Sequence, residues 1–137
     1  MPPRQPESVA ALARADQVNA ARTDATRAVM TLLAAGARMM PADRPWADSM
    51  LASVTPSAYP RACPTVGHPL AGPQPLYVLW PGYLMCRICF EGARTSGAAD
   101  PTVCAVCHRP DDWLRAMVAC RDLTIAYGQF CLNCGYA

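Results

Sequence analysis

The pattern of apolar and polar positions predicts a helical first third of the chain. From Glu7 to Met40 there is no proline and only one glycine, Gly36, and the segment is dominated by alanine, leucine and arginine, which favour helix. Apolar residues have helical spacing at both ends of this segment, whereas its middle is only weakly amphipathic. We therefore expect one long helix, or two shorter ones, ended by Pro41.

A second helix is predicted from Arg44 to Val54. Trp46, Met50 and Val54 recur every four residues, so they share one face of the helix. Asp43 is suited to capping this helix, and Pro45 is suited to its first turn.

The rest of the chain reads as a linker followed by strands. Residues 55–75 contain six prolines, which predicts a loop or linker. The apolar runs 76–80 and 123–130 predict two short strands. Residues 111–120 predict a short helix capped by Asp111, with an apolar stripe formed by Trp113, Leu114, Met117 and Val118.

These elements predict an α+β fold. We expect an alanine-rich helical N-terminal segment at 1–54, a proline-rich linker at 55–75, and a metal-stapled region at 76–137 made of short β-hairpins with one short helix. Cys63 and His68 lie in the linker and could join the C-terminal domain.

Charge and hydropathy limit the classes of protein and the cellular compartments that fit this sequence. The chain has 12 basic and 10 acidic residues, so net charge alone does not indicate a nucleic-acid-binding protein. No stretch reaches the ~18–20 apolar residues of a membrane span. Charged residues precede the longest apolar run, 28–37, which makes it a poor signal peptide. We expect a cytoplasmic protein without a membrane segment, where closely spaced cysteines indicate metal or redox chemistry rather than structural disulfides.

Three pairs of cysteines share a two-residue gap, and they are Cys86/Cys89, Cys104/Cys107 and Cys131/Cys134. Two thiolates at this spacing in a tight turn can reach one tetrahedral ion at ~2.3 Å. One such pair is a modest indication of a metal site, and three within about fifty residues are a strong one.

A weak internal repeat suggests how the pairs combine. The string "PGYLMCRIC" (81–89) is similar to "YGQFCLNC" (127–134), and "CPTVGHP" (63–69) is similar to "CAVCHRP" (104–110). The repeat predicts two four-ligand sets, each compatible with structural zinc. The first is Cys63, His68, Cys86 and Cys89, and the second is Cys104, Cys107, Cys131 and Cys134.

The second set resembles a zinc ribbon, in which two cysteine knuckles on β-hairpins clamp one ion. The resemblance covers residues 104–134 well and 63–89 loosely, since "CPTVGH" has a four-residue gap and a histidine. It implies a fold and a metal, one or two Zn²⁺ ions, and no particular partner. Cys120 is left over as a small buried apolar residue.

Other arrangements stay open on spacing alone. Cys86/Cys89 could join Cys104/Cys107, His108 could replace a cysteine, or the pairs could interleave over two ions. Four thiolates could also hold an iron–sulfur cluster. A thiol–disulfide enzyme would need a pair at a helix N-terminus, and Cys104/Cys107 precedes the helix predicted from Asp111.

The string "CAVCH" (104–108) also matches the attachment motif of a c-type haem, with Met117 as a candidate axial ligand. Haem explains neither of the other two cysteine pairs, and the sequence shows no export signal. We therefore favour zinc over haem.

The expected function is non-catalytic. Zinc with four protein ligands has no open position at which to activate water, and no general base is placed beside an open site, so we do not expect an enzyme or a small-molecule substrate. The first hypothesis is a zinc-stabilised adaptor that contacts a protein partner through its N-terminal helix, which could instead simply pack on its own domain.

Two further hypotheses compete with the adaptor. DNA or RNA binding would use C-terminal arginines and aromatic rings, although residues 84–137 carry five arginines and five acids. A third is a metal- or redox-responsive regulator in which Cys63, His68, Cys86 and Cys89 form the labile site. The arginines and aromatic residues of the nucleic-acid hypothesis are Arg87, Arg94, Arg109, Arg115, Arg121, Tyr83, Phe90, Trp113, Tyr127, Phe130 and Tyr136.

Overall fold

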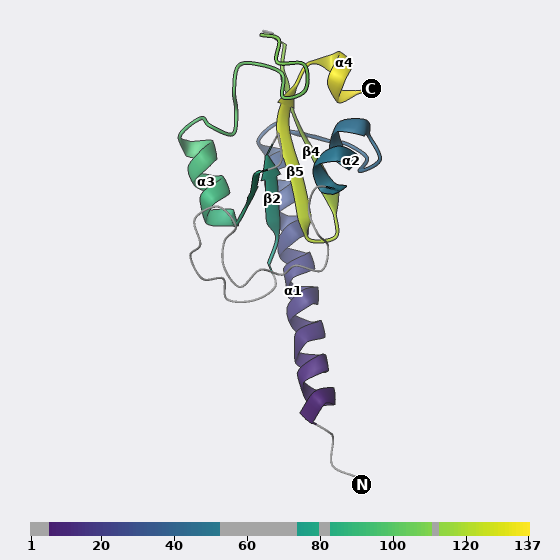
Figure 1. Ribbon diagram of the computed structural model, residues 1–137. Coiled ribbons are helices and arrows are strands. Elements are labelled where there is room, and N and C mark those ends of the chain that lie inside the picture. Colours follow the sequence, from purple (N-terminus) through teal and green to yellow (C-terminus); the bar gives the residue numbers. More distant parts are fainter. Residues whose placement is uncertain (1–5, 53–73, 80–82, 111–112) are drawn as a thin grey trace.

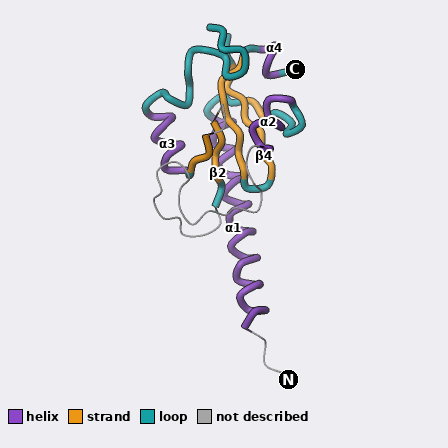
Figure 2. Tube along the Cα trace, viewed as in Figure 1, coloured by secondary structure: helices purple, strands orange, loops and turns teal. Residues whose placement is uncertain are grey.

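The computed structural model describes residues 6–52, 74–79, 83–110 and 113–137. A long N-terminal helix, α1, lies behind a mixed sheet, and shorter helices flank it (Figures 1 and 2). The predicted α+β class is confirmed. The predicted domain boundaries stay a prediction, because most of the linker at 55–75 lies outside the described residues.

Helix α1 is a single helix, Pro6–Ala34, and it ends earlier than the sequence suggested. Gly36 adopts φ +107°, a left-handed conformation that glycine reaches without a steric penalty. The amide of Gly36 donates to the carbonyl of Leu33, and that of Ala37 donates to Leu32, at 3.0 Å each. This is a Schellman stop, so Gly36 rather than Pro41 terminates the helix.

The chain then forms strand β1 (Arg38–Met39) and helix α2 (Pro45–Ala52). Pro45 occupies the first helical position, as expected. Trp46 and Met50 are buried on one face, which confirms their predicted role; Val54 lies outside the described residues.

The sheet has five strands in the order β1-β4-β5-β2-β3. Its centre is the antiparallel hairpin of β4 (Arg115–Arg121) and β5 (Thr124–Phe130). Strand β2 (Leu76–Leu79) runs parallel to β5, and β3 (Tyr83–Met85) runs antiparallel to β2. The predicted strands at 76–80 and 123–130 are therefore confirmed over Leu76–Leu79 and Thr124–Phe130.

The helix predicted at 111–120 is wrong, because residues 115–121 form strand β4. Met117 and Ala119 point to one face of the sheet, and Val118 and Cys120 point to the other. Both faces of β4 are covered, so apolar residues stand at consecutive positions and the alternation typical of a strand is hidden. Pairing with β5 along the whole strand overrides the helical propensity of the alanines.

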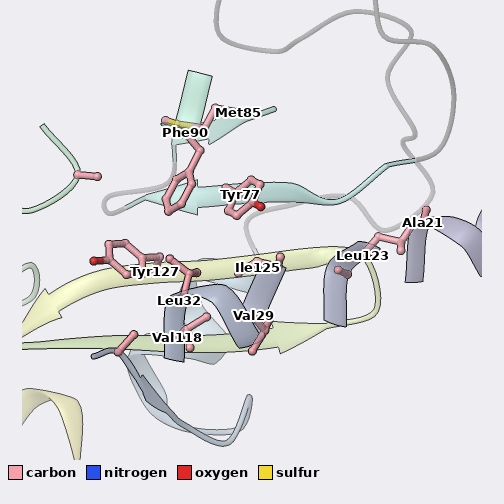
Figure 3. Packing of buried hydrophobic residues seen from close by; sticks show 13 residues of the cluster. Ala21, Val29, Leu32, Tyr77, Met85, Phe90, Val118, Leu123, Ile125 and Tyr127 are labelled. Atoms are coloured by element: carbon pink, nitrogen blue, oxygen red, sulfur yellow. The ribbon is translucent and has the colours of Figure 1, made fainter. Parts of the chain in front are cut away.

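Helices cover both faces of the sheet. On one face Val29 and Leu32 of α1 pack with Val118, Ile125 and Tyr127 (Figure 3). The buried residues of α2 cover the other face, together with Met117, Ala126 and Phe130. The first and last thirds of the chain thus share one layered core.

Two more helices follow hairpins. Helix α3 (Arg87–Thr95) follows the β2–β3 hairpin, and the short helix α4 (Leu132–Gly135) follows β4–β5. Because β3 runs opposite to β5, α3 and α4 start at opposite ends of the sheet (Figure 1). Within the described residues, no helix combines the length and the apolar character that crossing a bilayer requires.

Candidate metal centre

Four cysteines converge at one end of the β4–β5 hairpin. Cys104 and Cys107 lie on the turn that precedes β4, and Cys131 and Cys134 come directly after β5. Their four Sγ atoms all lie within 4.8 Å of one another. The structure therefore brings together the second ligand set predicted from the sequence.

The first pair is presented by a tight turn. The amide of His108 donates to the carbonyl of Cys104 at 2.9 Å, and the amide of Cys104 donates to the carbonyl of Arg109 at 3.0 Å. His108 itself has φ +59°, a left-handed conformation that is uncommon for a residue with a side chain. The amide of Ala105 donates to the carbonyl of Gln129 at 2.9 Å, which fixes the turn against β5.

The second pair is presented by the start of α4. Cys131 is the N-cap of this helix, with φ −69° and ψ 159°, and Cys134 is its third residue. This differs from the second hairpin knuckle expected from a zinc ribbon. The indole Nε1 of Trp46 donates to the carbonyl of Gly135 at 3.0 Å in a buried contact, so α2 holds the far end of α4.

The close packing around α4 depends on Gly135. A Cβ built at this position would collide with the end of the Met117 side chain, which would have to shift to admit a larger residue. Met117 is fully buried in the core beneath the cysteines. The chain end is therefore pressed onto the sheet at the point where the thiols meet.

The spacing of the thiols fits a tetrahedral dication. The Sγ atoms of Cys107 and Cys131 are 3.9 Å apart. Zn–S bonds of ~2.3 Å at a tetrahedral angle place two sulfurs about 3.8 Å apart. The donor set therefore fits zinc in size and chemistry, and all four donors are thiols.

The electrostatics of the cluster favour one thiolate and oppose a second. Burial raises the pKa of Cys104, but hydrogen bonds from the backbone amides of Cys107, Cys131 and Val106 outweigh it and lower the pKa to about 6. Burial and hydrogen bonds to the other three thiols raise the pKa of Cys134. A bound dication would supply the charge that lets all four ionise together.

The other predicted ligands do not join this cluster. Cys86 and Cys89 lie at the start of α3, at the opposite end of the sheet, and the cluster contains neither of them. The alternative that joins Cys86/Cys89 to Cys104/Cys107 is therefore not the arrangement of the structure. Cys63 and His68 lie outside the described residues, so the first ligand set stays a prediction.

The geometry around Cys104/Cys107 does not favour the haem or the thiol–disulfide alternative. His108 is exposed and lies outside the thiol cluster, and Met117 is packed against Gly135 in the core. The pair leads into a strand rather than a helix, so the helix N-terminus invoked for thiol–disulfide chemistry is absent there. None of the seven described cysteines is in a disulfide.

Cys120 stands apart from the cluster on strand β4. It is half-buried beside the α1 face of the sheet, and its thiol donates to the carbonyl of Asp122 at 3.4 Å. Burial, followed by the nearby charge of Asp122, raises its pKa. Its predicted role as a small packing residue agrees with this position, and it offers a matched control for cysteine substitutions.

Comparison with protein-family models, with curated proteins and with solved structures finds no match to this chain. The four-cysteine arrangement is compatible with a zinc-ribbon-like site, and this rests on the geometry of the cluster alone.

Sequence reasoning missed the supports of the site. Trp46 was predicted as a core residue of α2, but its hydrogen bond to Gly135 was not foreseen. Arg38 donates to the hydroxyl of Tyr136 at 2.6 Å, and Arg44 donates to the carbonyl of Tyr136 at 3.1 Å. These contacts span more than eighty residues, and no local pattern in the sequence indicates them.

Proposed function

We propose that this chain is a non-catalytic zinc-binding protein that acts as an adaptor for a protein partner. The observation that carries the metal-binding part is the convergence of four thiols from two distant segments on one point. Four protein donors complete the coordination of zinc and leave no position for water or substrate. This supports a structural role for the metal rather than a catalytic one.

The position of the centre supports a structural role on energetic grounds as well. Helix α4 has only four residues, too few to be stable in isolation. Structural zinc contributes on the order of 10–16 kcal/mol of apparent binding free energy in small domains. Such an ion would join the chain end, the turn at 104–108 and the β4–β5 hairpin into one unit.

The adaptor part of the proposal rests on α1. Its C-terminal half packs on the sheet, whereas its N-terminal half extends well beyond it (Figure 1). Val9 and Leu12 on this projecting part are 52% and 51% exposed. A helix of about fifteen residues is marginal in water without tertiary contacts, so a partner helix would stabilise this part of α1.

A second copy of the chain is the first partner to test. Val9 and Leu12 lie three residues apart, so they share one side of α1 and offer a second copy of this helix an apolar contact.

Two measurements on the full chain test the proposal. Native mass spectrometry of protein purified without added metal should show bound zinc, and replacement of Cys104 by serine should remove the ion from the four-cysteine centre. The matched control is Cys120→Ser, which should keep it. Iron or haem in place of zinc, or no metal in the unsubstituted chain, would overturn the assignment.

Analytical ultracentrifugation over a range of concentrations tests the adaptor part. Leu12→Asp should weaken self-association, whereas Met30→Asp, at an exposed position over the packed half of the same helix, should not. A chain that is monomeric at all concentrations would exclude the second copy as the partner of α1.

The nucleic-acid alternative finds less support in the described residues. Of its arginines, Arg87, Arg94 and Arg121 pair with carboxylates. Of its aromatic residues, Phe90, Tyr127 and Phe130 are buried in the core and cannot stack on bases. Strongly salt-dependent binding of DNA or RNA would restore this alternative over the adaptor.

A further inference from the structure

The two hairpins of the sheet are followed by helices that begin in the same way. Strand β3 ends at Met85 and β5 ends at Phe130, and in each case the next residue is a cysteine. Cys86 is the N-cap of α3 as Cys131 is the N-cap of α4, and each helix starts at the following residue. The second cysteine of each pair is the third residue of its helix.

The backbone conformation and the first helical hydrogen bond are also similar at Cys86 and Cys131. Cys86 has φ −78° and ψ 173°, close to the φ −69° and ψ 159° of Cys131. The amide of Phe90 donates to the carbonyl of Cys86, and the amide of Gly135 donates to the carbonyl of Cys131, both at 2.9 Å. The two pairs of thiols are therefore held by the same local structure.

We refer to β4–β5–α4 as the C-terminal unit and to β2–β3–α3 as the N-terminal unit. In the C-terminal unit, this local structure places two thiols where two more thiols meet them. In the N-terminal unit, Cys86 is buried against Leu76, the first residue of β2, and Cys89 packs beside it. Both residues thus lie at the N-terminal end of α3.

We propose that Cys86 and Cys89 are two ligands of a second zinc site, separate from the four-cysteine centre. The inference rests on the metal-binding role proposed above and extends it to a second ion. The separation follows from topology, because β3 and β5 run in opposite directions and place the two pairs at opposite ends of the sheet. One ion cannot serve both pairs.

A tetrahedral zinc ion would need two further donors at this site. In the C-terminal unit the partner cysteines, Cys104 and Cys107, precede the hairpin in the sequence. Cys63 and His68 precede the β2–β3 hairpin in the same order, which makes them the substitutions to test alongside the pair.

The first experiment is a metal count by native mass spectrometry on the full chain expressed with zinc. The unsubstituted chain should carry two ions, and the Cys86→Ser/Cys89→Ser variant should carry one. Cys120→Ser, the matched control, should carry two. One ion in both the unsubstituted chain and the double variant would overturn the second site and leave the four-cysteine centre intact.

A complementary variant separates the two proposals. Cys131→Ser/Cys134→Ser should keep one ion at Cys86/Cys89 if the second site exists. Two ions in the Cys86→Ser/Cys89→Ser variant would exclude these residues as ligands. A chain without metal that is two hydrogens lighter at Cys86–Cys89 would show a redox dithiol in place of the metal site.

A measurement on the unsubstituted chain avoids any folding defect of the variants. Replacing zinc by cadmium and recording the cadmium NMR spectrum should give two resonances, because two sites with different donors have different shieldings. A single resonance at full occupancy would overturn the second site. Loss of the upfield resonance on replacing His68 or Cys63, with the other retained, would identify the remaining donors.

Discussion

The two hairpin–helix units share one backbone plan but are fastened to the molecule by different forces. The C-terminal unit, β4–β5–α4, ends in a four-residue helix held by converging thiols and by the hydrogen bond from Trp46. In the N-terminal unit, β2–β3–α3, the helix has nine residues and a buried aromatic anchor. The comparison teaches that two helices that begin with the same cysteine spacing can differ in how much of their support comes from side-chain packing.

The aromatic anchor of α3 is Phe90. Its ring stacks on Tyr77 with ring centroids 4.1 Å apart, and it makes a T-shaped contact with Tyr127 with ring centroids 5.4 Å apart (Figure 3). Asp100, in the loop after α3, links this part of the chain to strand β5. It accepts hydrogen bonds from Tyr127 at 2.5 Å and from Gln129 at 2.7 Å. Helix α3 thus has a large buried aromatic side chain, whereas the buried residue of α4 is Gly135.

Loss of metal should have the largest effect, and it should fall on α4. Cys131→Ser should abolish protection of the amides in α4 and the turn at 104–108, because structural zinc would supply on the order of 10–16 kcal/mol there. Hydrogen exchange read by mass spectrometry measures this. Equal loss of protection in α3 would contradict the contrast between the units, and Cys120→Ser is the control.

Removal of the aromatic anchor should be the next largest effect, and it should fall on α3. Phe90→Ala should lower the free energy of unfolding by about 3–5 kcal/mol, because a large buried ring leaves a cavity. Urea denaturation measures it. Ile88→Ala, at a position 67% exposed on the same helix, should change it by less than about 0.5 kcal/mol. A similar loss for both variants would refute the role of Phe90.

The link between α2 and α4 should contribute less. Trp46→Phe keeps most of the buried ring and its packing on Phe130, with centroids 4.3 Å apart, but removes the donor to the carbonyl of Gly135. The unpaired buried carbonyl should cost about 1–3 kcal/mol. We expect a matching loss of zinc affinity, measured by competition with a coloured chelator, since two of the candidate ligands, Cys131 and Cys134, lie at α4.

Alkaline pH should weaken the packing around Tyr127. Burial, followed by the hydrogen bond to Asp100 and its charge, raises the pKa of Tyr127 above the usual 10.0. The folded state therefore holds this proton more tightly than the unfolded state does. Its contribution to stability is complete below about pH 10 and falls as pH rises above that value. Denaturation of the unsubstituted chain and of Tyr127→Phe from pH 8 to 11 should show a shallower decline in the variant.

The smallest effect should come from His108. Its left-handed backbone is natural for glycine, so His108→Gly should leave stability within about 1 kcal/mol and should retain zinc at the four-cysteine centre. Metal content and the urea midpoint measure this. Loss of the ion would mean that His108 is a ligand, as the haem motif or a substituted knuckle requires.

Much of the candidate site could be predicted from the sequence. The two-residue gap of Cys104/Cys107 and Cys131/Cys134 is a local property, and the structure brings together the two pairs that were predicted to combine. The strands at 76–79 and 124–130 were also predicted, because their apolar runs are bounded by turn residues. These features depend on neighbours in the chain, so a pattern is enough to find them.

Strand β4 shows where pattern reasoning fails. Its apolar residues face α1 on one side and α2 on the other, so the sequence alone contained nothing that distinguished a doubly buried strand from a helix. The stop of α1 was missed for a different reason. Gly36 was visible, but the two hydrogen bonds that make it a helix end are set by the folded backbone.

The sequence by itself thus determined the chemistry: which residues are thiols, how each pair is spaced, and that the first third is helical. Only the tertiary structure decided which pairs meet. The directions of the strands place Cys86/Cys89 and Cys131/Cys134 at opposite ends of the sheet. Cys104/Cys107 precede the β4–β5 hairpin and lie at the same end as Cys131/Cys134. The physical reason is that a metal centre needs convergence in space, which spacing along the chain permits but cannot specify.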